Sequence, residues 1–195
     1  MAIDLPAMPA VSGVPALSAG APLGAFVDLP SGEEALCLTT LDESGGIALA
    51  TAMVAAGVDI VEVGLPYSDP LMDGPVIQAA VHQSMTGGSN VAHVLDTVSA
   101  VAATGAPTLV MSYWNPIERV GVDSFAQRLH AAGGVGVITP DLTPEEAPDW
   151  ITATDAAGLD RVFLVAPSST DERIRAVAGV TSGFVYAAST IGVTG

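Results

Sequence analysis

Carboxylates gather in one short stretch of the chain, inside and just after an apolar run. The run DIVEVGL at 59–65 has the composition of a buried β-strand, and Glu62 interrupts it. The loop at 66–75 carries Asp69 and Asp73 among three prolines, which restrict its backbone. Carboxyl groups placed in this way could transfer protons during a reaction, so this stretch is the first candidate for a catalytic site.

Glu62 stands out because burying a charged group is costly unless the group is paired or functional. Strand alternation places it on the same face as Ile60 and Gly64. Withdrawal from water favours the protonated carboxyl and suits general acid–base catalysis. A glutamate paired with a buried arginine or a backbone donor explains the pattern equally well. For Asp69 a turn or capping role is favoured, and for Asp73 that role and a functional one are equally compatible with the sequence.

The elements that would position these residues alternate along the chain. Short β-rich runs precede helix-like stretches, which is typical of βαβ units, and apolar runs such as VFLV indicate strands buried on both faces. We predict strands at 35–41, 59–65, 107–113, 136–139, 160–165 and 183–188, and helices at 45–56, 76–85, 91–103, 122–132, 144–157 and 170–178.

This alternation fits either an open doubly wound sheet or a (β/α)8 TIM barrel. No G-x-G-x-x-G follows the first strand, so a dinucleotide site has no support. A full barrel usually takes about 250 residues, and this chain has 195. We predict an α/β TIM barrel that is incomplete here, with about six βα units. Its first and sixth strands would be exposed edges. Residues 1–24, rich in Ala, Pro and Gly, are expected to be a flexible tail before a partial barrel domain at 25–195.

Composition narrows the function classes. The formal net charge is -16 and the chain contains no Lys, which argues against binding nucleic acid or an anionic membrane surface. Cys37 is the only cysteine, so an internal disulfide is excluded, and a buried structural thiol is favoured over a nucleophile. The three histidines are scattered without ligand spacing. No apolar run approaches the roughly 20 residues that cross a bilayer, and a cytoplasmic protein is expected.

Several ordered motifs resemble the tryptophan synthase α subunit family. The likeness covers the chain from about residue 50 to its last residue. The motifs are EVGLPYSDPLMDGPVIQ at 62–78, MSYWNP at 111–116, TPDLTPEE at 139–146, FLVAP at 163–167 and YAASTIGVTG at 186–195.

The resemblance implies a lyase that cleaves indole-3-glycerol phosphate to indole and glyceraldehyde 3-phosphate by a retro-aldol reaction. Glu62 matches the family's general acid–base residue, and Asp73 matches the carboxylate near the indole nitrogen. Tyr113 matches a residue that lines the indole pocket, and Tyr186 a tyrosine at the end of the sixth strand. Core packing explains either tyrosine without the family. Two further matches lie at the chain end, the mobile-loop threonine Thr194 and the phosphate-site backbone contributor Gly195.

The resemblance also implies partners. The family's α subunit carries no cofactor and no metal, and it joins a pyridoxal-phosphate-dependent β subunit in an αββα tetramer. This chain departs from the pattern in three places. It ends at Gly195, before the seventh and eighth strands. Its first βα loop has Leu41 and Glu43 where the family has Gly and Pro, and residues 1–24 show no amphipathic helix.

Two other functions remain open. One is a different phosphate-handling β/α barrel, which the absence of lysine disfavours. The other is a catalytically impaired fragment that acts only as a docking module for the β subunit, through the loop at 66–75.

Overall fold

The structure is a computed structural model that describes residues 26–28, 34–39 and 43–188. Residues 1–24, Thr194 and Gly195 lie outside the described residues, so the predicted tail and the two loop residues have no structural account. The strands are β1 Phe26–Asp28, β2 Glu34–Thr39, β3 Ile60–Gly64, β4 Thr108–Met111, β5 Gly136–Ile138, β6 Asp160–Val162, β7 Leu164–Val165 and β8 Tyr186–Ala187. The helices are α1 Glu43–Ala55, α2 Pro75–Thr86, α3 Val91–Ala102, α4 Trp114–Val120, α5 Val122–Ala131, the short 3-10 helix η1 Pro144–Glu146, α6 Pro148–Ala157 and α7 Asp171–Val180.

The strands lie side by side in the order in which they occur in the sequence. One sheet runs from β1 to β6, and β7 pairs with β8. The pairs from β2 to β6 and the β7–β8 pair are parallel. Only Phe163 separates β6 from β7, and its carbonyl accepts the N–H of Tyr186 at 3.1 Å, so β8 follows the same edge. A sequential order without reversal is that of a barrel, whereas a doubly wound sheet reverses at a switch point.

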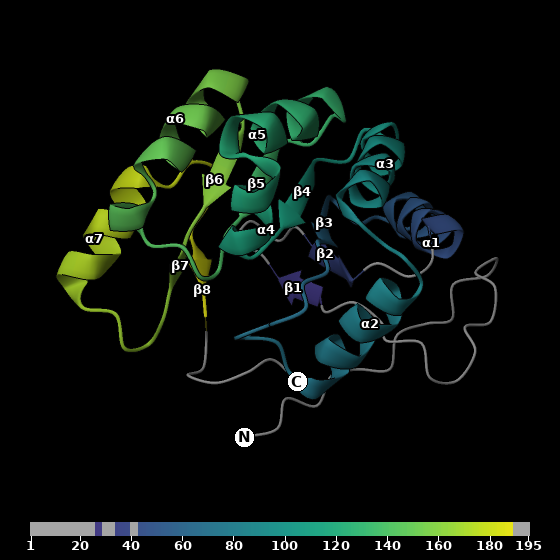
Figure 1. Ribbon diagram of the computed structural model, residues 1–195, viewed down its shortest axis with the longest axis horizontal. Coiled ribbons are helices and arrows are strands. Elements are labelled where there is room, and N and C mark those ends of the chain that lie inside the picture. Colours follow the sequence, from purple (N-terminus) through teal and green to yellow (C-terminus); the bar gives the residue numbers. More distant parts are fainter. Residues whose placement is uncertain (1–25, 29–33, 40–42, 189–195) are drawn as a thin grey trace.

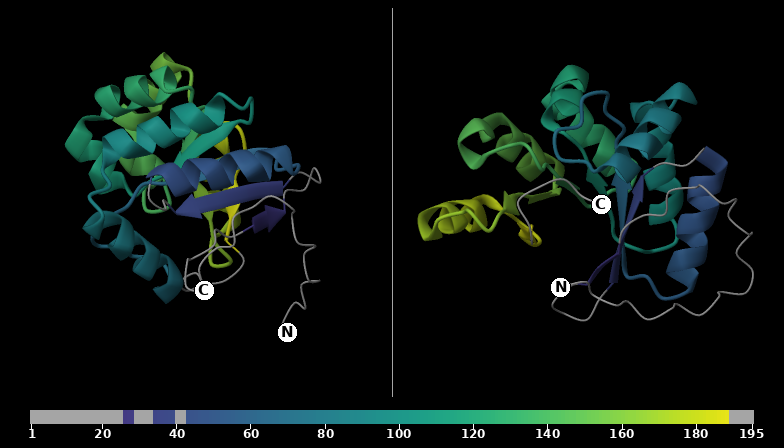
Figure 2. Two further views of the ribbon diagram at one scale, coloured as in Figure 1. Left: turned by 90° about the vertical axis from the view of Figure 1, so that its right-hand side faces the viewer. Right: turned by 90° about the horizontal axis from the view of Figure 1, so that it is seen from below.

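The two faces of this sheet differ in what covers them. The side chains of Val61, Val63, Val110 and Val137 belong to the main core under the helices. The other face carries a smaller apolar cluster, named here the inner cluster, formed by Leu109, Ile138 and Val162 with Ile60, Met111, Leu164, Phe184 and Tyr186 packed against them. Figure 2 shows the helices in an arc outside the strands, from α1 at one end to α7 at the other. The inner cluster is therefore the interior of the partial barrel.

The edge of the first predicted strand is not exposed, contrary to expectation. β1 pairs with β2 in antiparallel fashion, with Phe26 opposite Leu36 and Asp28 opposite Glu34. The sequence predicts no element at 26–28, because three residues are too few to show a periodicity. Its hydrogen bonds supply the partners that the β2 edge would otherwise lack.

Helix α4 was also not predicted. It begins at Trp114 and includes Pro116, a residue that usually ends helices. Pro116 lies in the first turn, where the backbone N–H groups have no partner within the helix, so the missing N–H costs nothing there. The strand predicted at 107–113 is correspondingly shorter, Thr108–Met111.

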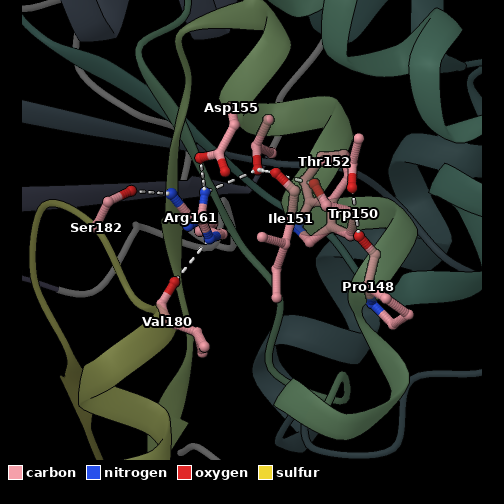
Figure 3. A network of polar contacts seen from close by, with 9 residues as sticks. Pro148, Trp150, Ile151, Thr152, Asp155, Arg161, Val180 and Ser182 are labelled. Carbon is pink, nitrogen blue, oxygen red and sulfur yellow. Dashed lines mark hydrogen bonds and ion pairs between the residues drawn. The ribbon is translucent and has the colours of Figure 1, made fainter.

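Arg161 joins the last βα units to one another (Figure 3). Its side chain is 12% exposed and forms an ion pair with Asp155 of α6. The same guanidinium donates from Nε to the Val180 carbonyl at 2.7 Å, at the end of α7. Its backbone N–H donates to Ser182 Oγ at 3.0 Å, and Ser182 N–H returns a bond of 3.0 Å to the Arg161 carbonyl. This set of bonds fixes where α7 ends and where the segment leading to β8 begins (Figure 1).

Candidate active site

Glu62 lies in the middle of β3 and is 6% exposed. Its parallel neighbour in β4 is Leu109, which in turn pairs with Gly136 of β5. Neighbours in register share a face of the sheet, so Glu62 belongs to the face of the inner cluster and not to the helix-covered face. The structure thus places the predicted acid–base carboxyl in the barrel interior among apolar side chains.

Tyr186 lies on the same inner face. It is half-buried on β8, opposite Leu164 of β7, and packs against the inner cluster. The structure therefore brings Glu62 and Tyr186 to one interior surface, although 124 positions separate them in the sequence (186 − 62).

Asp73 and Tyr113 meet in the loops beyond the strands. Tyr113 follows β4, is 6% exposed, and accepts the backbone N–H of Met72 on its hydroxyl at 2.9 Å. The same hydroxyl forms a side-chain hydrogen bond with Asp73. The Asp73 carbonyl accepts the side-chain amide of Gln78 at 2.8 Å. The bond from Met72 to Tyr113 holds the loop after β3 against the end of β4, with the Asp73 carboxylate near the Tyr113 phenol.

Burial is the main electrostatic influence on this pair. Desolvation raises the pKa of Asp73 above 3.8, and the hydrogen bond from Tyr113 opposes that rise. Desolvation raises the pKa of Tyr113 to about 12, opposed by the bond from Met72 and increased by the charges of Asp73 and Asp141. Tyr113 therefore remains protonated at neutral pH and is the donor toward the Asp73 carboxylate.

Asp69, for which a turn or capping role was favoured, is exposed on the same loop. Its Oδ2 accepts the hydroxyl of Ser68 at 2.6 Å. Tyr67, two residues earlier, stacks at a tilt on Tyr113 with ring centroids 5.4 Å apart. The tyrosine ring turns toward the site while the Asp69 carboxylate turns toward solvent.

Asp141 was not singled out in the sequence, although it lies in one of the recognised motifs. It follows β5, is half-buried, and its two carboxylate oxygens accept the Trp114 backbone N–H at 2.9 and 3.1 Å. Desolvation raises the pKa of Asp141 above 3.8, and the bond from Trp114 opposes the rise. An acidic residue in the loop that follows a buried parallel strand is the available signal, since the functional edge of such sheets is the carboxyl edge.

A cleft of about 490 Å³ lies beside this loop. Residues of the loop after β3 and of α2 form its walls: Tyr67, Ser68, Pro70, Gln78, Val81, His82, Met85 and Thr86. Two further apolar side chains of the loop are exposed, Leu71 at 74% and Met72 at 36%. Glu62, Asp73 and Tyr113 are not among its lining residues, so the cleft lies beside these groups and not around them.

The part of the chain that the structure describes holds no group of three or more His, Cys, Asp or Glu side chains able to bind a metal ion. Within the same ranges, no helix is long and apolar enough to span a membrane.

The parallel strands follow one another in sequence order, as in part of a (β/α)8 barrel. The inner face of this partial barrel carries Glu62, and the loops at the strand ends carry Asp73 and Tyr113. Together these residues define a candidate acid–base site. Comparison with known proteins agrees. The family model described as tryptophan synthase alpha chain matches residues 36–195. The chain belongs to the tryptophan synthase alpha chain family.

Relatives in that family are similar over most of this chain. The tryptophan synthase alpha chain of Thermobifida fusca is 61% identical over 154 residues, which are 79% of this chain and 57% of that protein. That of Salinispora tropica is 60% identical over 151 residues, or 77% and 57%. The chain therefore spans a little over half the length of these curated relatives.

Solved structures show the same fold. A tryptophan synthase structure from Mycobacterium tuberculosis superposes with a TM-score of 0.78 at 52% identity, covering 82% of this chain and 63% of that one. The alpha subunit of Legionella pneumophila superposes with a TM-score of 0.72 at 33% identity, covering 78% and 60%. The predicted barrel class, incomplete in this chain, is confirmed.

Proposed function

We propose that the chain carries the acid–base groups of a lyase that cleaves indole-3-glycerol phosphate to indole and glyceraldehyde 3-phosphate. Glu62 gives a proton to indole C3. The bond between C3 and the glycerol side chain then breaks as the neighbouring hydroxyl becomes the aldehyde carbonyl and gives its proton to the Glu62 carboxylate, which the first step left ionised. The bonding electrons return to the ring, C3 keeps its new proton, and indole leaves. Tryptophan biosynthesis in the cytoplasm is the matching context.

Asp73 has the second role in this proposal. Protonation at C3 leaves positive charge on the indole ring nitrogen, and a fixed carboxylate near N1–H stabilises that charge. Its hydrogen bond with Tyr113 holds the carboxylate in place, and Tyr113 and Tyr186 offer aromatic surfaces to the indole. Thr194 closes the site over the substrate, and the backbone of Gly195 contributes to the phosphate site.

The observation that carries the proposal is the position of Glu62. Its carboxyl group is 6% exposed on the inner face of the partial barrel, in a chain of the tryptophan synthase alpha chain family. It lies two residues before the end of β3, and the carboxyl ends of the strands are where such barrels bind their substrates. The helix-covered face of the sheet is filled by the main apolar core.

A β subunit is the proposed partner, in an αββα tetramer, and pyridoxal phosphate belongs to that subunit. Tryptophan synthase structures are among those that match, including one described as a complex from Pyrococcus furiosus. The exposed Leu71 and Met72 and the neighbouring cleft give this partner an apolar surface beside the site.

Indole release from indole-3-glycerol phosphate tests the proposal, measured for the chain alone and with a β subunit. Glu62→Gln keeps the shape and removes the acid–base group, and we expect kcat to fall on the order of 10²- to 10⁴-fold. Glu118→Gln, the same change at an exposed position, is the control and leaves kcat unchanged. Equal turnover by the Glu62→Gln variant rules out the assigned role. Stimulation of the β subunit without any indole release favours the docking function instead.

A further inference from the structure

A single path of hydrogen bonds joins three consecutive βα loops. Asp141, after β5, accepts the Trp114 N–H at 2.9 Å, at the start of α4. The preceding residue, Tyr113, accepts the Met72 N–H at 2.9 Å in the loop after β3 and bonds to Asp73. The path crosses the carboxyl edge of the sheet from β5 to β3.

Tyr113 is held at its backbone from two sides. Ser112 Oγ donates to the Tyr113 carbonyl at 2.8 Å. The next amide along the chain, that of Trp114, donates to both carboxylate oxygens of Asp141. Because the peptide between Tyr113 and Trp114 is fixed in this way, the direction of the Tyr113 side chain is fixed as well.

The need to cap helix α4 does not by itself explain why the acceptor of the Trp114 N–H, Asp141, comes from another loop. Helix α3 is capped by its own Asn90, and α7 by its own Thr170, each bonding N–H groups two or three residues later. The N-cap residue of α4 is Tyr113, whose side chain makes no capping bond and points to Met72 instead. The cap from Asp141 leaves the tyrosine side chain available to the site.

We propose that Asp141 is a positioning residue for the Asp73–Tyr113 pair, holding Tyr113 through the Trp114 amide. The effect that we expect on catalysis rests on the proposed function. The effect that we expect on the position of Tyr113 rests on the hydrogen bonds alone. Asp141 acts as an acceptor for an N–H group. Its negative charge is secondary, so an uncharged side chain of the same shape serves in its place.

Two measurements test the inference, and the first needs no activity. Asp141→Ala is expected to raise hydrogen exchange at the Met72 amide on the order of tenfold, because Tyr113 no longer holds that N–H. Tyr113→Phe raises it as well, and Asp141→Asn, which keeps the acceptor oxygen, leaves it near wild type. Thr170→Ala, a cap removed from α7, is the control and leaves Met72 unchanged.

The second measurement is indole release. Asp141→Ala is expected to lower kcat/KM on the order of 10- to 100-fold, the effect of a displaced active-site group. Asp141→Asn stays within about fivefold of wild type, since it replaces a charge-assisted bond by a neutral one. In a Tyr113→Phe background, Asp141→Ala adds less than about twofold, because coupled residues are not additive.

An unchanged Met72 exchange rate in folded Asp141→Ala overturns the inference, as do additive losses in the double variant. Should Asp141→Ala not fold, Asp141→Glu displaces the carboxylate by one methylene and has to raise the Met72 exchange rate. A wild-type chain that releases no indole, but shows the expected exchange pattern, contradicts the proposed function and supports the positioning role.

Discussion

The Nε–H of Arg161 donates to the carbonyl of Val180 at 2.7 Å, so a strand residue satisfies the end of the helix that follows it. The last carbonyls of a helix lack partners within the helix, and a side chain nearby can supply one. The bond fixes the spacing between β6 and the turn that leads to β8, and hence the place at which Tyr186 enters the inner cluster.

Replacing Arg161 by Met removes this bond and keeps much of the side-chain volume. We expect the free energy of unfolding to fall by about 2–4 kcal/mol, because part-buried acceptors at Val180 and Thr154 lose their donor. The ion pair itself contributes little of this, as Asp155 is 63% exposed. Urea denaturation followed by circular dichroism measures the change. Arg175→Met, at a position 77% exposed on α7, is the control and should stay within about 0.5 kcal/mol of wild type. Equal losses in the two variants would show that the Val180 bond contributes nothing.

Tyr113→Phe should shift the acid limb of the pH–rate profile to higher pH. The hydrogen bond from Tyr113 lowers the pKa of Asp73 against the larger rise caused by burial, so its loss lets that pKa rise further. If Asp73 acts as an anion, activity is lost as pH falls through its pKa, and the loss begins at higher pH in the variant. The profile of kcat/KM for indole release between pH 5 and pH 8 is the measurement. An acid limb that stays in place or moves to lower pH contradicts the role of Tyr113.

The raised pKa of Asp141 predicts that the stability of the fold depends on pH. Its pKa is raised above 3.8 in the folded chain by burial, so the folded state binds its proton more readily than the unfolded state does. Stability therefore increases as pH falls from the folded pKa toward the unfolded value. Asp141→Asn has no proton to bind at this position. As pH falls through that range, the unfolding free energy of wild type should therefore rise relative to that of the variant. Urea titrations from pH 7 to pH 4 test this, and a difference that is constant with pH would refute it.

Trp150 is the largest fully buried side chain in the described ranges. Its ring lies edge-on to Trp114 at 5.9 Å and tilted to Phe125 at 6.3 Å, which joins α4, α5 and α6. Trp150→Ala should lower the unfolding free energy by about 3–5 kcal/mol through the cavity it leaves. Its Nε1–H has no hydrogen-bond partner within the described structure, so Trp150→Phe removes a buried polar group and should cost no more than about 2 kcal/mol. Thermal unfolding compares the two, and equal losses would contradict the packing argument.

Local patterns in the sequence were sufficient for the strand that carries the site. An apolar run of five to seven residues with one glutamate predicts a buried strand, and the two-residue period puts Glu62 on the face of Ile60. Strand–helix alternation predicted parallel winding, because parallel strands need a crossover between them. The predictions failed where the signal was short or ambiguous, as at β1 and at Pro116 of α4.

The relationships that join the site are tertiary. Tyr113 and Met72 lie 41 positions apart, and Asp141 and Trp114 lie 27 apart, so no local pattern relates them. They meet because β3, β4 and β5 are adjacent and parallel, which brings the ends of all three strands to one edge. Residue types and their order therefore determined which strand holds Glu62 and which loop holds Asp73. The order of strands in the sheet decided that Glu62 faces the barrel interior. It also decided that Asp73 lies beside the Tyr113 side chain, and that Asp141 bonds to the peptide that joins Tyr113 to Trp114.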